Sequence, residues 1–442
     1  MPTAPATPLT ATRAPRPLRG AMHLPGDAII GRWALAAAGL AVGESRISEL
    51  PDLPEAITCL QALGVTVMPA PDGGLRVFGR GVGGLAEPQR ALQVGSSAEW
   101  AMMLAGMLAS HPVFAVLDGP ARLDPRNWAQ MHSLLARTGA NLLGRSGGGL
   151  PLAIKGADDA RPLEVELKRP SARVKAMLLL CGLNAGGQTR IVEPERTHDH
   201  GEVMLRRFGA RVESEPAGRG QTIVLRGQPE LRGCEVTVPG DITLASLPLL
   251  AALVVPGSSV TLPAVGLNPT RTATLDVMRA MGASVAGTAT DAAEPFGDLV
   301  AEHGALRAVT TAWEMAPAFS ETYPILAALA ATAVGTSRFV GLGSVGRQAP
   351  DRLARVAAAL RHCGVAAETE GEDLLVTGQS APPAGGAQVA VGDDGWLAMA
   401  CLTLGLVAAA PIAIDDGGGL LRVFPGAVTA INALADAVWR PR

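Results

Sequence analysis

Cysteine and histidine side chains are the first candidates for chemistry in this chain of 442 residues, and their spacing does not favour a metal centre. The five cysteines are Cys59, Cys181, Cys234, Cys363 and Cys401, and no two of them form a Cys-x-x-Cys pair. The histidines do not join them at the spacing of a zinc site. Such cysteines are typical of reduced core residues in a cytosolic protein. We therefore expect a cytoplasmic location, no bound metal and no cofactor.

Any catalytic or binding residues of this chain are positioned by six similar segments. Each has a charge-poor helical stretch, then a strand-like run, then a second, amphipathic helix. The charge-poor stretches are 34–42, 101–109, 174–182, 245–254, 325–333 and 397–406. The strand-like runs are 44–47, 112–117, 188–192, 258–262, 336–340 and 411–414. Because the stretches are apolar nearly all round, we expect them to be helices buried between other elements, with the amphipathic helices outside.

Glycine ends the second helix in five of the six copies, where a left-handed residue is least strained. These glycines are Gly64, Gly139, Gly209, Gly282 and Gly364. The sixth helix, 427–438, lacks the glycine, as a terminal copy can. The repeat is too long for a solenoid layer, so each copy should be a small α/β subdomain. The phrase Leu24-Pro25-Gly26-Asp27 recurs as Val238-Pro239-Gly240-Asp241, which predicts two halves of three copies each.

Composition excludes several classes of partner. The formal charge of −3 gives no indication of binding to nucleic acid or to an anionic membrane. Residues 396–414 carry no charge over a length that could span a bilayer, but Gly405 and Pro411 interrupt them where the other copies pass from helix to strand. We therefore expect core rather than a membrane span. Residues 1–8 should be a disordered tail and not a secretory signal.

Several longer phrases, in order along the chain, carry a resemblance to a known family. Besides the two Pro-Gly-Asp phrases, they are Pro170-Ser171-Ala172-Arg173-Val174-Lys175, Thr197-His198-Asp199-His200, Gly266-Leu267-Asn268-Pro269-Thr270-Arg271-Thr272 and Asp351-Arg352-Leu353. Together they resemble the 5-enolpyruvylshikimate-3-phosphate synthase family, most of all the bacterial forms with an SAQVKSA-type motif. The resemblance extends from about Leu9 to Ala435.

The resemblance implies an α/β fold of the enolpyruvyltransferase type, with six βαβαββ-type units, three per domain, and a cleft between the domains. Domain one would comprise 9–23 and 238–442, and domain two 24–237. In the family the cleft binds shikimate 3-phosphate and phosphoenolpyruvate. An enolpyruvyl group then moves to a hydroxyl with loss of phosphate, in the shikimate pathway of aromatic amino acid biosynthesis. The family also implies a monomer that binds small molecules.

Some site positions of the family are retained. Arg126 stands where an arginine grips phosphoenolpyruvate, and Arg352 matches a second such arginine. Glu321 aligns with the catalytic aspartate. Ser171 and Lys175 match the stretch that holds the shikimate phosphate, where Arg173 replaces a glutamine and His198 replaces an arginine nearby. Alternatively, Arg126 and Arg352 are surface or interdomain salt-bridge residues.

Other cationic positions are replaced. After the first Pro-Gly, the lysine, serine and arginine of the family are Ala28, Ile29 and Trp33. Further along, an arginine is Met102, a lysine is Gln348 and the arginine of an Asp-His-Arg phrase is Trp396. Removing one hydrogen bond to a charged group typically costs about 1.5–3 kcal/mol, so removing four would cost on the order of 6–12 kcal/mol. On this estimate we expect a divergent paralogue, a pseudoenzyme for the standard transfer.

Tryptophans occupy several phrases that line the family's cleft. They are Trp33, Trp100, Trp128 and Trp396, out of six in the chain. Their flat apolar faces suggest an aromatic-lined cleft for a less charged small molecule, oriented by Arg126, Arg173, Glu321 and Arg352. The alternative is that the tryptophans fill the cleft as ordinary core.

Three functions therefore stay open. The first is an enzyme or binder for a different, less charged small molecule, which we expect. The second is a non-catalytic scaffold or regulator. The third is a working 3-phosphoshikimate 1-carboxyvinyltransferase with an unusual site. The related branch that acts on UDP-N-acetylglucosamine is not favoured, because it uses a loop cysteine and residues 117–131 contain none.

Overall fold

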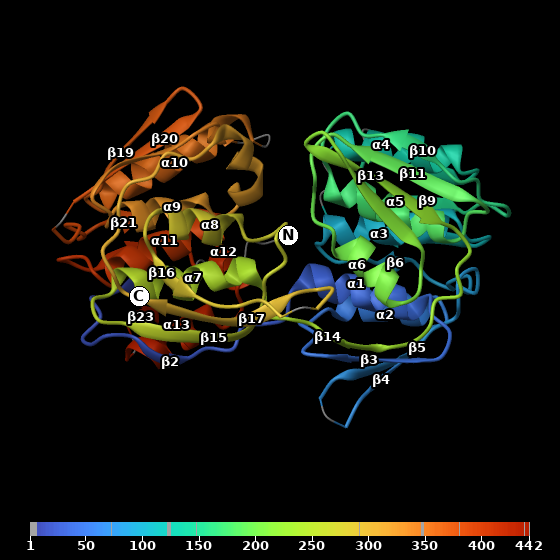
Figure 1. Cartoon of the computed structure of the whole chain (residues 1–442), viewed down its shortest axis with the longest axis horizontal. Coiled ribbons are helices and arrows are strands. Elements are labelled where there is room, and N and C mark those ends of the chain that lie inside the picture. The colour runs from blue at the N-terminus through green and yellow to red at the C-terminus, as the bar shows by residue number, and fades with distance from the viewer. Residues whose placement is uncertain are drawn as a thin grey trace. The chain divides into compact units, whose positions relative to one another are not determined.

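The computed structural model describes residues 7–71, 73–121, 125–146, 148–290, 292–345, 349–379, 381–436 and 438–441. The chain divides into two compact units. Unit 1 consists of Met1–Leu24 together with Gly240–Arg442, and unit 2 consists of Pro25–Pro239. Within each unit, helices alternate with small sheets (Figure 1).

Unit 2 contains three copies of one arrangement. Its buried helices are α1 (Ala28–Gly39), α3 (Ala98–Ala109) and α5 (Ala172–Leu183). Its second helices are α2 (Pro54–Ala62), α4 (Pro125–Arg137) and α6 (His200–Arg207). The strands are β3 (Glu44–Ser48), β4 (Thr66–Pro69), β5 (Leu75–Phe78), β6 (Leu92–Gln93), β7 (Phe114–Asp118), β8 (Asn141–Gly144), β9 (Leu152–Lys155), β10 (Glu164–Glu166), β11 (Gln188–Glu193), β12 (Val212–Ala217), β13 (Gly220–Arg226) and β14 (Glu235–Thr237).

These strands form three four-stranded sheets, ordered β14-β3-β5-β4, β6-β7-β9-β8 and β10-β11-β13-β12. The first two strands of each sheet are parallel and the remaining pairs are antiparallel. Along the chain, β6-α3-β7-α4-β8-β9 is a βαβαββ unit, as predicted. The first copy takes its parallel edge strand from β14, at the far end of the same segment, so one sheet joins the two ends of unit 2.

Unit 1 repeats the arrangement around the buried helices α7 (Ile242–Val254), α9 (Tyr323–Ala330) and α11 (Gly395–Gly405). Its other helices are α8 (Ala273–Ala280), α10 (Ala349–His362), α12 (Gly418–Val423), α13 (Ala427–Ala435) and two 3₁₀ turns, η1 (Trp313–Phe319) and η2 (Leu342–Ser344). The strands are β1 (Leu9–Ala11), β2 (Arg19–Ala21), β15 (Ser259–Gly266), β16 (Ser284–Ala286), β17 (Phe296–Glu302), β18 (Gly335–Phe339), β19 (Ala366–Glu370), β20 (Asp373–Gly378), β21 (Gln388–Val389), β22 (Ile412–Ile414) and β23 (Trp439–Pro441).

The N-terminal strands complete two of the three sheets of unit 1. The sheet orders are β16-β17-β15-β2, β18-β20-β19 and β21-β22-β1-β23. β1 lies between β22 and β23 and is antiparallel to both, whereas β2 is parallel to β15. The first residues of the chain are thus part of the same unit as its last residues.

The helix boundaries follow the predicted signals. Every residue of α9 and of α11 is buried, as the apolar stretches predicted. The five glycines after the second helices all have positive φ, from +86° at Gly282 and Gly364 to +105° at Gly139. At Gly364 a Cβ would also lie 2.8 Å from the backbone nitrogen of Ala384. The sixth helix, α13, ends instead at Asp436, which adopts a left-handed φ of +56°.

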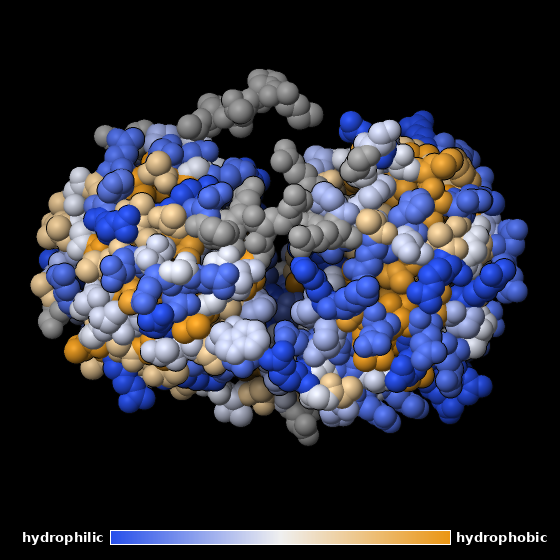
Figure 2. Space-filling view, turned by 90° about the horizontal axis from the view of Figure 1, so that it is seen from above, coloured by the Kyte–Doolittle hydropathy of each residue, from blue (hydrophilic) through white to orange (hydrophobic). Residues whose placement is uncertain are grey.

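Each unit has its own apolar core around its three buried helices. On the face seen in Figure 2, hydrophilic side chains are interspersed with smaller hydrophobic patches. Residues 396–414 form α11, a turn and β22 inside unit 1, which confirms the prediction of core. Among the described residues, no helix is both long enough and apolar enough to cross a membrane.

Candidate active site

The buried helices of unit 2 begin at side-chain caps that the sequence provides. Asp27 Oδ1 accepts hydrogen bonds from the backbone N–H groups of Ile29 (2.8 Å) and Ile30 (3.2 Å) at the start of α1. Ser97 caps α3 and Ser171 caps α5 in the same way. Helix N-termini carry partial positive charge and attract anions. These ends are therefore candidate positions for anionic ligands.

The first turns of four helices of unit 2 meet at one small cavity. It has a volume of about 10 Å³, roughly enough for one water molecule. The residues around it come from α1, α3, α5 and α6 and from the segment before α6. They are Ile29, Trp33, Glu99, Ala172, Lys175, Ala176, His198, His200, Gly201 and Glu202. Three of the predicted site residues, Trp33, Lys175 and His198, thus lie together.

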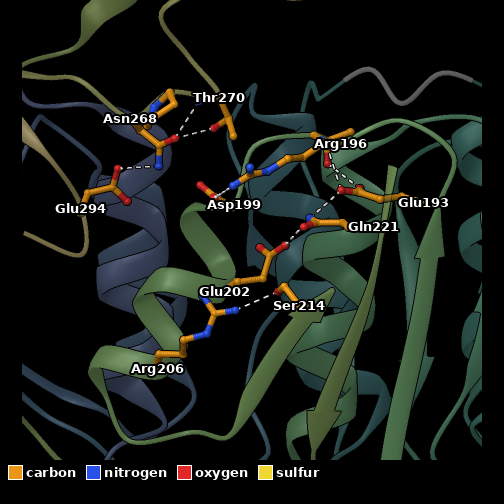
Figure 3. Close-up of polar contacts among 12 residues, drawn as sticks. Glu193, Arg196, Asp199, Glu202, Arg206, Ser214, Gln221, Asn268, Thr270 and Glu294 are labelled. Atoms are coloured by element: carbon orange, nitrogen blue, oxygen red, sulfur yellow. Dashed lines mark hydrogen bonds and ion pairs between the residues drawn. The ribbon is translucent and has the colours of Figure 1, made fainter. Parts of the chain in front are cut away.

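Lys175 belongs to a buried polar group, here called the Lys175 cluster: Lys175, Glu193, Thr197, Glu202 and Gln221. Its amino group lies 2.9 Å from Glu202 Oε1 and 3.3 Å from Glu193 Oε1. The side chains of Lys175, Glu202 and Glu193 are 2%, 1% and 0% exposed. Figure 3 shows the Gln221 amide between the two carboxylates, donating to Glu193 at 2.8 Å and to Glu202 at 3.4 Å. The lysine charge is thus committed to two carboxylates of its own unit.

The two carboxylates of this cluster have different surroundings. Glu193 also accepts from the backbone N–H (3.0 Å) and the hydroxyl (2.8 Å) of Thr197. Burial raises the pKa of the Glu202 carboxyl above its ordinary value, although the Lys175 charge and hydrogen bond act in the opposite direction. Glu193 thus has more hydrogen-bond donors around it than Glu202, whose neutral form is favoured by burial.

The tryptophans are mainly core residues. Trp33, Trp100 and Trp396 are 3%, 0% and 8% exposed. The Trp33 ring packs on α6, where a Cβ added to Gly201 would lie 2.4 Å from Trp33 Cζ2. Trp128 is partly buried and packs against Gly144 and Gly148. The burial of Trp33, Trp100 and Trp396 favours the alternative that these tryptophans fill core over the prediction of an aromatic-lined pocket. Large apolar rings gain most from complete burial.

In unit 1, Arg352 on α10 is the centre of a dense set of contacts. It makes a bidentate ion pair with Asp394, with Nε 2.6 Å from Oδ2 and Nη2 3.1 Å from Oδ1. Nη1 donates to the carbonyl of Ser320 (2.6 Å) and Nη2 to that of Glu321 (2.9 Å). The guanidinium also lies 4.7 Å from the centre of the Tyr323 ring. Arg352 therefore joins α10 to the starts of α9 and α11.

The charges around Arg352 support this arrangement. Burial lowers the pKa of Arg352, but hydrogen bonds to Asp394 and its charge outweigh burial and leave the pKa above its ordinary value. The guanidinium is accordingly always charged. Asp394 also caps α11 by accepting from the Leu397 N–H at 3.1 Å. Burial raises the pKa of Tyr323 to about 12.

The remaining residues that the sequence analysis singled out differ in exposure and position. The Glu321 side chain is exposed, and Glu321 lies two residues before the first residue of α9. Arg173 is exposed in the first turn of α5, and His198 is half-buried, with its ring centre 6.0 Å from that of His200. The side chain of Arg126 and the whole of Gln348 lie outside the described residues.

Sequence reasoning missed Glu193, Glu202 and Gln221. A signal existed for Glu193, because Thr189, Ile191 and Glu193 alternate on the buried side of β11. Glu202 has a similar signal, since it lies three residues before the buried Leu205 on α6. A carboxylate at a core position indicates a buried partner. That partner, Lys175, was interpreted only as a ligand contact.

Comparison with known proteins gives the family. A family model described as EPSP synthase (3-phosphoshikimate 1-carboxyvinyltransferase) matches residues 12–430. A protein of Acidiphilium cryptum (strain JF-5) named 3-phosphoshikimate 1-carboxyvinyltransferase is 45% identical, over 98% of this chain and 98% of its own. One of the same name from Granulibacter bethesdensis is 44% identical, over 93% of this chain and 92% of its own.

Solved structures agree on the fold. An EPSP synthase from Acinetobacter baumannii superposes with a TM-score of 0.89 at 26% identity, over 98% of this chain and 99% of that one. The enolpyruvyl transferase NikO from Streptomyces tendae gives a TM-score of 0.73 at 20% identity, over 99% of both chains. The predicted enolpyruvyltransferase-like fold is thereby confirmed.

The same comparisons correct the functional prediction. The expectation of a pseudoenzyme that binds a less charged molecule is contradicted by proteins named 3-phosphoshikimate 1-carboxyvinyltransferase at 38–45% identity over nearly the full chain. The estimate behind it counted absent cationic side chains only, whereas backbone N–H groups at helix N-termini also attract anions. With relatives of this identity and a family model that matches most of its length, the chain belongs to the EPSP synthase family.

Proposed function

We propose that this chain is a working 3-phosphoshikimate 1-carboxyvinyltransferase of the shikimate pathway. The observation that carries the proposal is the 45% identity to a protein of that name over 98% of both chains. In the proposed reaction, the carboxyvinyl carbon of phosphoenolpyruvate loses its bond to the phosphate oxygen and gains one to a hydroxyl oxygen of 3-phosphoshikimate. The proton of that hydroxyl leaves with the phosphate.

Both substrates are anions, so the proposal assigns roles to groups that hold negative charge. Arg352 is suited to a carboxylate or phosphate, because Asp394 and two carbonyls fix the plane of its guanidinium before a ligand arrives. Arg126 is the second proposed arginine. Ser171, Arg173 and His198 stand at or near the N-termini of α5 and α6, which favour a phosphate.

The exposed carboxylate of Glu321 is the proposed proton-transfer group. Its own backbone carbonyl accepts from Arg352 at 2.9 Å, so the segment that carries it is anchored. Lys175 is proposed to act indirectly, because Glu193 and Glu202 occupy its amino group and thereby fix the first turns of α5 and α6.

The proposal includes a monomer that acts without a cofactor in the cytoplasm. The five cysteines support the compartment, since all are free thiols and four of them are buried. No nucleic acid or membrane partner is proposed.

Two measurements test the function. The first is growth of a bacterial mutant that lacks this step, on medium without aromatic amino acids. The second is phosphate release by purified protein from phosphoenolpyruvate, with and without shikimate 3-phosphate. We expect rescue of growth and release that depends on both substrates. Soluble, folded protein that gives neither would refute the proposal.

Matched arginine variants on α10 locate the activity. Arg352→Ala removes the guanidinium clamp and should lower kcat/KM by about 10²-fold or more, because each charged hydrogen bond that is removed costs about 1.5–3 kcal/mol. Arg355→Ala removes an exposed arginine one turn further along the helix and should leave kcat/KM near its original value. Equal effects of the two variants would contradict the role of Arg352.

A further inference from the structure

A cavity of about 380 Å³ lies within unit 1, where its three buried helices end. Val254 is the last residue of α7, Leu406 follows α11 directly, and Thr332 follows α9 by two residues. These three residues line the cavity together with the segment between β1 and β2. The helix N-termini described above as candidate positions for anionic ligands lie elsewhere, either at the opposite ends of these helices or in unit 2. A cavity of this size falls in the range that holds small organic ligands.

The wall formed by the segment between β1 and β2 is fixed by backbone hydrogen bonds. The N–H of Ala14 donates to the carbonyl of Leu406 at 2.9 Å. The N–H of Leu18 donates to the buried hydroxyl of Ser258 at 2.8 Å. Val254 and Leu406 are 5% and 1% exposed and give the inner part of the cavity an apolar surface. The cavity is thus shaped by anchored chain and has an apolar floor.

The described residues that line the cavity include three basic side chains and no carboxylate. The basic residues are Arg13, Arg16 and His303, all exposed, so they stand at the mouth of the cavity and not on its floor. Arg16 is paired with Asp436, with Nη2 2.6 Å from Oδ1. Arg13 makes no ion pair within the described part of the chain. One guanidinium at the mouth is therefore available to an anion.

A simpler explanation is that these cations only offset the negative ends of the helices. In unit 2, neutral side chains donate to or between the ends of two comparable helices, α3 and α5. His111 Nδ1 donates to the carbonyl of Met107 (2.7 Å) near the end of α3, and its Nε2 accepts from the Gly83 N–H (3.1 Å). Burial lowers the pKa of His111, which favours the neutral ring. After α5, Asn184 Nδ2 donates to the carbonyl of Ser110 (2.5 Å). Neutral donors thus satisfy carbonyl groups at these two helix ends. The basic residues at the mouth of the cavity in unit 1 therefore need an explanation other than the helix ends.

We propose that this cavity binds a small organic carboxylate with an apolar body. The carboxylate would face Arg13 at the mouth, where a charge-assisted hydrogen bond is possible. The apolar body would lie against Val254 and Leu406, because these side chains are apolar and the helix ends there repel negative charge. Inorganic phosphate would use only the mouth, and a neutral hydrocarbon only the floor. The site is independent of the carboxyvinyl transfer proposed above.

Three probes separate these contributions by isothermal titration calorimetry at low ionic strength. Benzoate has both parts, acetate has only the carboxylate, and benzyl alcohol has only the ring. Benzoate should bind at least about tenfold more tightly than either of the other two, which corresponds to about 1.4 kcal/mol. Equal affinity of benzoate and acetate, or no heat of binding with benzoate at millimolar concentration, would overturn the proposal.

Variants then locate the binding. Arg13→Ala should weaken benzoate binding about tenfold, and Ala14→Trp should abolish it by filling the cavity. Arg19→Ala is the matched control, since Arg19 is exposed on the neighbouring β2 and does not line the cavity. Benzoate affinity that falls equally in Arg13→Ala and Arg19→Ala would show non-specific attraction and contradict the site.

Discussion

Removal of the amino group of Lys175 tests the account of the Lys175 cluster most directly. The variant Lys175→Met keeps a flexible apolar chain and deletes the charge that lies 2.9 Å from Glu202 and 3.3 Å from Glu193. All three side chains are at most 2% exposed, so water does not screen the removal of the charge. Removing one partner of a buried ion pair typically costs about 3–5 kcal/mol. We expect a destabilisation of this size at pH 7.

The pH dependence follows from the two carboxylates. Glu193 keeps three hydrogen bonds when Lys175 is removed, from the Thr197 N–H, the Thr197 hydroxyl and Gln221. Glu202 has a pKa that burial raises, and its buried Oε2 has no hydrogen-bond partner within the described part of the chain. A carboxyl whose pKa is raised on folding gives stability that is present below its unfolded pKa and is lost as pH rises through the folded pKa. Without Lys175 that pKa rises further, so the cost of Lys175→Met should shrink as pH is lowered from 7 towards 5.

Hydrogen exchange of α5 and α6 at pH 5 and pH 7, corrected for the intrinsic exchange rate at each pH, measures the local free energy of opening. Urea unfolding at the same two pH values gives the midpoint for the whole protein. Glu202→Gln is the matched control, because it leaves Lys175 paired with Glu193. We expect it to cost less than Lys175→Met, since Lys175 keeps its ion pair with Glu193, and to weaken the pH dependence. A cost below about 1 kcal/mol for Lys175→Met at pH 7, or a cost equal at both pH values, would refute this reasoning.

Three further predictions follow from packing and charge. Gly201→Ala places a Cβ 2.4 Å from the Trp33 ring and should lower the free energy of unfolding by about 1–3 kcal/mol, measured as a lower Tm. The double variant with Trp33→Phe should recover part of the lost stability. An unchanged Tm in Gly201→Ala would contradict the packing of Trp33 on Gly201. Arg352→Lys cannot reproduce the bidentate pair with Asp394, so kcat/KM should fall at least about tenfold in a phosphate-release assay, with Arg355→Lys unaffected. Burial raises the pKa of Cys59 to about 11 and that of Cys181 to about 12, and it also raises the pKa of Cys234. Because Cys234 is half-buried and the other four cysteines are buried, a thiol reagent at pH 8 should modify Cys234 first. Faster modification of a buried cysteine, mapped by mass spectrometry, would argue against this order.

Local signals in the sequence were enough to predict the repeat. Gly64 and Gly364 mark helix ends because few other residues tolerate their positive φ, and this constraint does not depend on distant parts of the chain. The charge-poor stretches likewise identify the buried helices, since a helix without a polar face has to be covered on all sides. In contrast, the pairing of β14 with β3 and the insertion of β1 between β22 and β23 were not predicted. Those pairings join residues far apart in sequence, and the sequence of a short strand does not indicate which other strand pairs with it.

The candidate site was harder to predict for a different reason. Trp33 and Lys175 were interpreted through positions of a family pattern, and a pattern gives the residue type but not the direction of the side chain. In the structure Trp33 points to Gly201, and Lys175 points to Glu193 and Glu202, all within unit 2. Both directions depend on which helix lies next to α1 and α5, which a single sequence does not reveal.

The helix caps show why counting cationic side chains underestimated the capacity of the site for anions. The N-terminus of α5 is capped by the hydroxyl of Ser171 and has no acidic residue in its first turn, so the partial positive charge of this helix is largely uncompensated. α3 is capped by the hydroxyl of Ser97 but carries Glu99 in its first turn, which offsets that charge. At α1, α7 and α11 the caps are the carboxylates of Asp27, Asp241 and Asp394, which already offset that charge. Within unit 2, a phosphate is therefore favoured at the start of α5 more than at the starts of α1 and α3. The replacements Ala28, Ile29 and Trp33 all fall on α1, whose N-terminal partial charge is already offset by Asp27.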